Sequence, residues 1–246
     1  LGAALMKAAM TLALALLLNG SSAAADLAAS SLSPYVADYK VKYGSLSVGA
    51  SRTALSRSNV PDLWTLETEL RASGLGRLVA DGDMLQHSSF QFDAAGPRPL
   101  RYRFDDGTKS TERDVTLQFD WRAGRVTGVA EEEPVDVAIE SGLQDAASSQ
   151  AFVQWRLQGG AEPGVVAMIE KDKIKYYQYT LLRRERLKTA IGVLDTVVYR
   201  SAREGSSREN LFWYAPELGY VIVQAEQRRD GKRLFQTYIS GYRPGS

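Results

Sequence analysis

The sequence contains no cysteine and only one histidine, His87. The absence of cysteine excludes disulfide bonds, thiol nucleophiles, cysteine-ligated zinc and iron–sulfur clusters. A single histidine cannot build a histidine-rich metal site, and it allows at most one Ser-His-Asp triad. We therefore expect no metal site.

Motifs for common cofactors and activated nucleophiles are absent as well. The chain has no P-loop, no dinucleotide-binding fingerprint, no zinc-binding helix motif and no G-x-S-x-G turn. We therefore expect no bound cofactor. The 30 basic and 29 acidic residues leave a net charge of +1. Such a balance gives no general attraction to nucleic acid, so no nucleic-acid partner is expected.

The N-terminal segment has the three parts of a secretory signal peptide. Lys7 precedes an uncharged apolar run over residues 8–18, and small residues follow at Ala23, Ala24 and Ala25. The run is shorter than the roughly 20 residues that span a membrane. We predict a signal peptide over 1–25 with cleavage after about Ala25, a flexible lead-in over 26–34 and a single soluble β-rich domain over 35–246. The alternative is a buried N-terminal helix.

Alternation of apolar and polar residues dominates the chain after residue 34 and indicates β-strands. Asp-Gly at 106–107, Ala-Gly at 123–124 and Asp-Gly at 230–231 are typical of hairpin turns between such strands. The stretch 131–134 is interpreted as a loop. The expected strands cover residues 35–43, 44–56, 64–72, 100–105, 115–122, 173–188, 194–203, 210–214, 219–229 and 232–242.

One segment, residues 143–157, has helical spacing instead. Apolar residues recur there every four positions, at Leu143, Ala147, Ala151 and Trp155. Strands on both sides of one helix, without a repeated βαβ pattern, argue against a doubly wound or TIM-barrel fold. We predict a mainly β fold of the α+β class: a curved antiparallel sheet or partly closed β-barrel with one central helix.

Short motifs spread over nearly the whole predicted domain resemble those of a known family. They are residues 35–43 followed by Gly44 and Gly49, Arg98-Pro99-Leu100, Phe119-Asp120-Trp121, Leu143-Gln144-Asp145, and residues 191–197 and 213–220. In this order they resemble a bacterial exported family, domain of unknown function 3108 (DUF3108). That family would place a proline after Tyr220, where this chain has Val221, so the local strand geometry stays open.

The resemblance implies a β-rich fold and an envelope location, which we take to be the periplasm. It supplies no activity and no catalytic residue. The positions that belong to its motifs include Asp120, Gln144, Asp145, Gly192 and Trp213.

Three residues are candidates for acid–base chemistry: His87, Asp120 and Asp145. Histidine is the usual base near neutral pH, but Ser88 beside His87 would face the opposite side of a strand. Asp120 lies between two aromatic residues and would face the other side of its strand. Asp145 lies where a carboxylate would cap the predicted helix. A structural role explains each of them and is the preferred interpretation.

Other charged stretches are interpreted as surface features. Residues 81–83 and 105–107 combine Asp with Gly, as turns require, and lack the spacing of a calcium loop. Residues 131–133 are three glutamates of a solvated loop. The basic clusters at 183–188 and 228–233 would mark strand edges or hairpin ends, with binding to anionic lipid headgroups as the alternative.

Aromatic residues provide the leading functional hypothesis. If the sheet curves around the helix, Trp64, Phe119, Trp121, Trp155 and Trp213 would line a concave space for a hydrophobic ligand. A packed core is the simpler explanation of the same residues.

We expect a periplasmic protein, not an enzyme, that binds a lipid or lipidated partner in a β-lined groove. An analogy of architecture with periplasmic lipoprotein carriers supports this choice. One alternative is an envelope glycan hydrolase or lyase that uses Asp120, Asp145 or His87. Another is an envelope assembly or scaffold protein that adds a strand to a partner.

Overall fold

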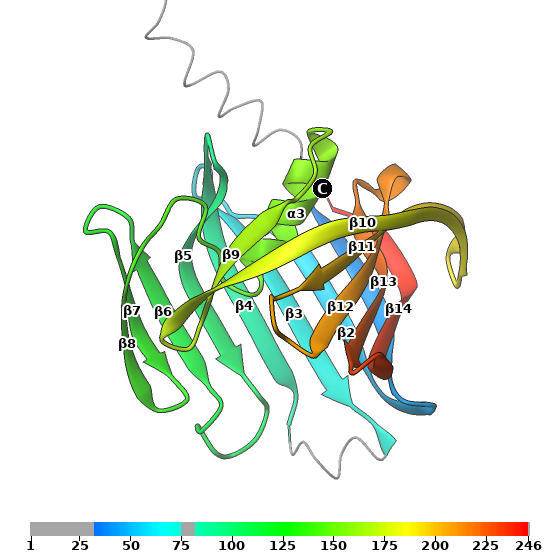
Figure 1. The fold of residues 1–246 in the computed structure, drawn as a ribbon, viewed down its shortest axis with the longest axis horizontal. Coiled ribbons are helices and arrows are strands. Elements are labelled where there is room, and N and C mark those ends of the chain that lie inside the picture. Colours follow the sequence, from blue (N-terminus) through cyan, green and yellow to red (C-terminus); the bar gives the residue numbers. More distant parts are fainter. Residues whose placement is uncertain (1–31, 75–81, 246) are drawn as a thin grey trace, which may run out of the picture.

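The computed structural model describes residues 32–74 and 82–245, which form one antiparallel sheet with a helix at one end (Figure 1). The predicted signal peptide, its cleavage site and residues 26–31 of the lead-in lie outside the described residues. The elements are β1 (Tyr35–Tyr43), β2 (Leu46–Arg57), β3 (Trp64–Ala72), β4 (Met84–Asp93), β5 (Gly96–Asp105), β6 (Val115–Asp120), β7 (Arg125–Ala130), β8 (Glu133–Ala138), α3 (Ser148–Gln158), β9 (Val165–Glu170), β10 (Lys173–Thr189), β11 (Gly192–Ala202), β12 (Arg208–Ala215), the short 3-10 helix η2 (Pro216–Leu218), β13 (Val221–Arg229) and β14 (Lys232–Pro244).

The sheet is a single ladder of 14 strands in the order β8-β7-β6-β5-β4-β3-β2-β1-β14-β13-β12-β11-β10-β9. Strands that follow one another in the sequence pair with each other, apart from β8 and β9, which α3 separates. One further pairing joins the first strand, β1, to the last strand, β14. The first and last strands therefore lie at the centre. One wing of the sheet consists of β1 to β8, and the other consists of β9 to β14.

The two wings curve toward each other, but β8 and β9 do not pair. Polar contacts join the segments around these edges instead. Gln144 forms a parallel bridge with Met168 in β9. The Tyr176 hydroxyl donates a hydrogen bond to Glu140 Oε2 (2.9 Å), and Lys171 forms an ion pair with Glu131. The sheet thus encloses an interior without closing fully.

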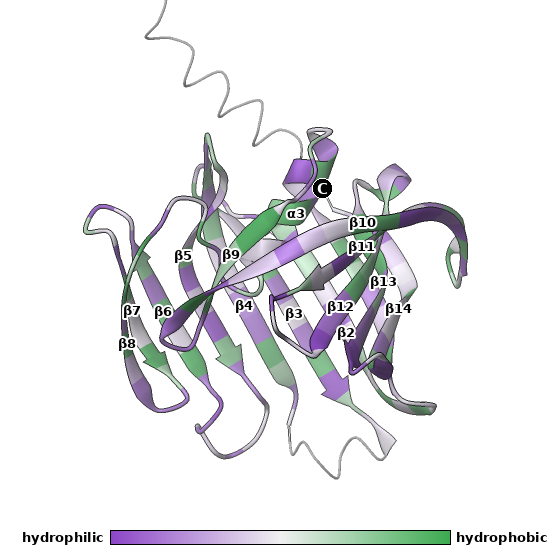
Figure 2. Ribbon diagram, in the orientation of Figure 1, coloured by the Kyte–Doolittle hydropathy of each residue, from purple (hydrophilic) through white to green (hydrophobic). Residues whose placement is uncertain are grey.

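Strand alternation places the core on the inner face of the curved sheet. In β1, Tyr35, Ala37, Tyr39 and Val41 are buried, whereas Lys40 is exposed. Figure 2 shows the same alternation of hydrophobic and hydrophilic residues along other strands. Burial of each large apolar side chain contributes about 1.5–3 kcal/mol. The predicted curved antiparallel sheet is confirmed, with one α-helix among the described residues. The sheet is not closed into a barrel, and the helix lies at one end of the interior and not at its centre.

Helix α3 covers one end of this interior. Its side chains contact strand ends from both wings: the Tyr35 hydroxyl donates to Gln154 Oε1 (3.2 Å), and Gln158 Nε2 donates to the Gly219 carbonyl (2.8 Å). Within residues 32–74 and 82–245, no helix is both long and apolar enough to cross a membrane.

The helix begins later than the sequence predicts. Expected over 143–157, it runs from Ser148 to Gln158. Gln144 forms the bridge to Met168 in β9: its backbone N–H donates to the Ala167 carbonyl, and its own carbonyl accepts from the Ile169 N–H (both 2.9 Å). Leu143 precedes this bridge, and its N–H donates to the Glu140 carbonyl (3.2 Å) in a turn. Leu143 is fully buried, so the apolar spacing that it shares with the helix reflects burial and not helical geometry.

Other boundaries differ from the expected ones by a few residues. The stretch 131–134 is not a loop throughout: Glu131 and Glu132 make a tight turn with positive φ (53° and 68°), and β8 begins at Glu133. The alternation of apolar and polar residues did not single out β7, β8 or β9. Val221 begins β13 directly after Tyr220, which has a φ of +60°. The register of β13 against β12 shifts between Trp213 and Tyr214, so the start of the strand is irregular.

Helix α3 packs closely on the sheet at Gly96. It has a φ of +112°, and a Cβ atom there would lie 2.8 Å from Trp155 Cε3 on the helix. We expect Gly96→Ala to lower the free energy of unfolding by about 3 kcal/mol, because backbone strain and overpacking add. The matched control is Gly124→Ala, which has a φ of +69° but open space around the Cβ position. It should cost only about 1 kcal/mol. Urea unfolding compares the two, and equal losses would contradict the packing argument.

Candidate functional site

A cavity of about 250 Å³ lies inside the curved sheet, beside the first turn of α3. It exceeds the roughly 150 Å³ that accommodates benzene in an engineered protein core. Its lining contains no Asp, Glu, Lys, Arg or His. The cavity therefore presents an uncharged surface, with different chemistry on its two sides.

One wall is polar and comes from β2, β3 and β4. It contains Ser51, Thr53, Thr68 and Gln86. Thr53 and Thr68 are direct cross-strand partners whose hydroxyl oxygens lie 2.9 Å apart. Gln86 Nε2 donates to the Tyr102 hydroxyl (3.0 Å). This wall offers hydroxyl and amide groups to a bound molecule.

The opposite wall is aromatic and comes mainly from β10 and β12. The rings of Tyr179 and Phe212 are stacked, with centroids 6.2 Å apart, and Tyr214 lies 6.0 Å from Phe212. Burial raises the pKa of Tyr179 to about 12, so its hydroxyl is neutral at physiological pH. Tyr39 completes the wall, and its hydroxyl donates to the Ile222 carbonyl (2.8 Å).

Asp145 directly precedes Ala146, which lines the cavity, and it anchors the N-terminus of α3. Its carboxylate accepts hydrogen bonds from the backbone N–H groups of Ala147 (2.8 Å) and Ser148 (2.7 Å). The Ser148 hydroxyl accepts from the Asp145 N–H in return (3.0 Å). This reciprocal pattern is a capping box, so the predicted capping role is confirmed.

The same carboxylate ties the helix to the sheet. The Ser88 hydroxyl on β4 donates to Asp145 Oδ2 (2.6 Å), and Asp145 is fully buried. Burial raises the pKa of Asp145 to about 6, although the hydrogen bonds from Ser88, Ser148 and Ala147 act in the opposite direction. The hydrogen bonds thus offset only part of the cost of removing the charge from water.

The three acid–base candidates do not converge. His87 lies on the face of β4 opposite to Ser88, as strand geometry predicts, between its cross-strand partners Glu67 and Arg103. Asp120 Oδ1 accepts from the Ala123 N–H (2.8 Å) and so stabilises the β6–β7 turn. Asp145 is buried on the inner side.

The predicted ligand-binding aromatics are dispersed, and none of them lines the interior cavity. Trp64 (2% exposed) and Phe119 (6%) are core residues. Trp155 packs on Gly96. Trp213 donates from Nε1 to Glu185 Oε1 (2.5 Å) beneath the Arg183 guanidinium.

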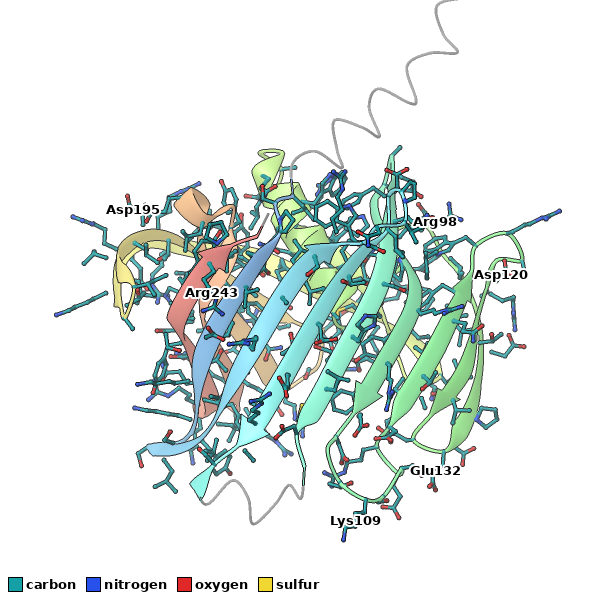
Figure 3. All side chains as sticks on the ribbon, turned by 180° about the vertical axis from the view of Figure 1, so that it is seen from behind. Arg98, Lys109, Asp120, Glu132, Asp195 and Arg243 are labelled. Atoms are coloured by element: carbon teal, nitrogen blue, oxygen red, sulfur yellow. The ribbon has the colours of Figure 1, made fainter. Side chains whose placement is uncertain are left out.

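Trp121 and Phe119 border a second hollow of about 700 Å³ on the outer face of β4 to β7. The Trp121 Nε1 group donates to the Pro99 carbonyl (2.6 Å), and the Arg98 guanidinium lies 5.0 Å from the ring. Figure 3 shows Arg98 and Asp120 near the end of the sheet that carries α3. This hollow is separate from the interior cavity.

The remaining motif positions have structural contacts. Gln144 Nε2 donates to the Pro97 carbonyl (2.8 Å), which ties the segment before α3 to β5. Gly192 begins β11 with a φ of +135°, and its carbonyl accepts from the Thr189 hydroxyl (2.8 Å).

The acidic stretch at 105–107 is a turn, as predicted. Asp106 accepts hydrogen bonds from the N–H (2.9 Å) and hydroxyl (2.6 Å) of Thr108, which lower its pKa. Asp81 of the other predicted acidic turn lies outside the described residues.

Sequence reasoning did not identify the residues of the cavity. A usable signal exists in the polar wall: Thr53, Thr68 and Gln86 occupy inward positions of three successive strands where alternation predicts apolar residues. The aromatic wall has no such signal, because inward Tyr and Phe are typical of any β core.

Residues 38–232, more than half of the chain, match the sequence family described as "Protein of unknown function (DUF3108)". The chain belongs to the DUF3108 family. The resemblance drawn from its motifs is thereby confirmed. No curated protein gives a significant match to the sequence.

Solved structures resemble this DUF3108 member at low sequence identity. A β-barrel-like protein of domain of unknown function DUF1849 from Brucella abortus has a TM-score of 0.56 and 10% identity over 87% of this chain and 99% of that chain. A candidate lipoprotein from Parabacteroides distasonis has a TM-score of 0.38 and 10% identity, covering 87% of this chain and 96% of its own. A candidate exported protein with a YmcC-like fold from Bacteroides fragilis has a TM-score of 0.34 and 9% identity, covering 86% and 96%. At such identity, the Brucella similarity concerns the fold alone.

The buried Asp145 predicts a specific pH dependence of stability. Because its pKa rises from 3.8 to about 6 on folding, the stability due to its protonated form is fully present below pH 3.8 and is lost as the pH rises through 6. Asp145→Asn keeps an acceptor for the helix N–H groups but cannot ionise. Between pH 4 and pH 7, the unfolding free energy of the native protein should therefore fall by about 2–3 kcal/mol relative to this variant.

Urea unfolding at both pH values measures this difference, and a difference that does not change with pH would contradict it. Ser88→Ala provides a second check. It removes a hydrogen bond that lowers the pKa of Asp145, so the loss of stability should extend to higher pH.

Proposed function

We propose that this protein is an exported periplasmic protein, not an enzyme, that holds the apolar part of a lipid or lipidated partner inside its curved sheet. One observation carries the proposal: the interior contains an uncharged cavity with an aromatic wall. Helix α3 covers one end of this interior, so a ligand would enter from the other end.

The two walls suit an amphipathic molecule. The rings of Tyr179, Phe212 and Tyr214 provide apolar contact area, and the groups of Thr53, Thr68 and Gln86 could hydrogen-bond an ester or a glycerol unit. A charged headgroup would remain outside, because the lining offers it no counter-charge. At about 250 Å³, the cavity would hold only part of an acyl chain.

The placement of the acid–base candidates favours binding over hydrolysis. Glycoside hydrolysis needs two carboxyl groups on either side of one bond. Asp145 is committed to the helix cap, Asp120 stabilises an exposed turn, and His87 is on the outer face of β4. None of the five predicted aromatic residues lines the cavity. Their direct part in ligand binding stays a prediction.

Filling the cavity tests the proposal. Ala225 lines the cavity on β13, and Ala225→Phe would occupy the space without removing an existing contact. We expect this variant to bind the uncharged fluorophore N-phenyl-1-naphthylamine at least about tenfold more weakly, with little loss of stability. Fluorescence titration measures the affinity.

The matched control is Ala50→Phe, which adds the same ring at an exposed position of β2. It should bind like the native protein. Equal affinity of both variants, or no binding to the native protein, would reject the cavity as a binding site.

A further inference from the structure

The end of the sheet opposite to α3 carries three exposed apolar side chains. Tyr43 (50% exposed) is the cross-strand partner of both Leu46 (50%) and Phe235 (42%). The rings of Tyr43 and Phe235 lie 5.0 Å apart. The Gly44 N–H donates to the Leu234 carbonyl (2.9 Å), which holds the β1–β2 turn against β14. We call Tyr43, Leu46 and Phe235 the rim patch.

The rim patch continues the inner surface of the sheet. Phe235 lies two residues from Thr237, which lines the cavity, and Tyr43 lies two residues from Val41, which is buried. Residues two apart on a strand share a face. The next row of the inner wall is therefore apolar and exposed to solvent, and no helix within residues 32–74 and 82–245 covers it.

Basic residues surround the rim patch. Residues 227–235 contain four cations, Arg228, Arg229, Lys232 and Arg233, and one carboxylate, Asp230. Lys42 adds an ammonium group over the Tyr238 ring (5.2 Å) on the outer face. Arg228 and Arg233 share Glu226, and Arg229 pairs loosely with Asp230 (3.8 Å). Lys232 has no ion pair among the described residues.

The far side of the same end has the opposite charge. Residues 105–114 contain four carboxylates (Asp105, Asp106, Glu112 and Asp114) against two cations (Lys109 and Arg113), and the β7–β8 turn carries Glu131, paired with Lys171, and Glu132. Figure 3 shows Glu132 and Lys109 at this end, away from Arg98 and Asp120. An anionic surface would thus attract only the side with the rim patch.

We propose that the rim patch docks on a lipid bilayer that contains anionic headgroups. Tyr43, Leu46 and Phe235 would insert at headgroup depth, while Arg229 and Lys232 contact phosphates. Amphipathic aromatic and basic side chains are typical of such interfaces. Docking there would place the open end of the interior against the bilayer and would give a lipid a route into the cavity. This inference therefore rests on the proposed function.

Vesicle co-sedimentation tests this surface with the purified protein. We expect binding to vesicles of phosphatidylcholine mixed with phosphatidylglycerol to exceed binding to phosphatidylcholine alone by at least about tenfold, and to weaken in high salt. The double variant Leu46→Ser with Phe235→Ser should lose about tenfold on both vesicle types. Its control is Val165→Ser with Val193→Ser, two equally exposed apolar residues elsewhere (57% and 52%), which should bind like the native protein.

A second pair of variants tests the charges. Arg229→Glu with Lys232→Glu should remove the preference for phosphatidylglycerol. The same change in the other basic cluster, Arg184→Glu with Lys188→Glu, should leave it intact, since both side chains are exposed on β10, away from the rim patch. Equal effects of the two pairs would reject the assignment of this surface.

The fluorophore titration separates this inference from the proposed function. If the rim variants lose vesicle binding but still bind N-phenyl-1-naphthylamine, the docking surface is supported. If the native protein binds the fluorophore but neither vesicle type, the docking surface is rejected and the cavity stands. A cross-link to a periplasmic protein that only the rim variants lose, without any vesicle binding, would assign the patch to a protein partner and overturn the proposal.

Discussion

The pairing of β1 with β14 joins the two ends of the described chain. Asp38 and Arg243, which are separated by 205 positions, form an ion pair across these two strands. It makes β1 the central strand, with β2 on its other side. Without this pairing, the two wings would be separate sheets, each with an additional unpaired edge. Closing so long a loop costs entropy, which the ladder and the apolar inner face offset together.

Helix α3 depends on that arrangement because it contacts both wings. Its Gln154 and Gln158 bond to groups at the ends of β1 and β13, and its cap, Asp145, bonds to Ser88 in β4. The cap is thus also a tertiary contact. The position of the helix requires that the Asp145 carboxylate be buried, which costs free energy. Since one short helix covers one end, the other end keeps an open interior. The cavity and the exposed rim patch both follow from this asymmetry.

The similarity to the DUF1849 protein at 10% identity indicates that two very different sequences can form this architecture. The chemistry of the interior is free to vary, so the fold does not specify a ligand. For this chain, the distribution of hydroxyl, amide and aromatic groups around the cavity provides the functional argument.

The sequence by itself determined the class of the fold, most strand positions, the turns and the capping role of Asp145, because each depends on residues close together in the chain. Alternation reveals which residues share a face, and an Asp before a helix reveals a cap. Only the tertiary structure decided that Gln144 pairs with β9, that Trp213 packs under Arg183, and that Thr53 faces Phe212 across a cavity. These contacts join strands that are distant in sequence, and local periodicity carries no information on which inward-facing side chains meet and which leave a space between them.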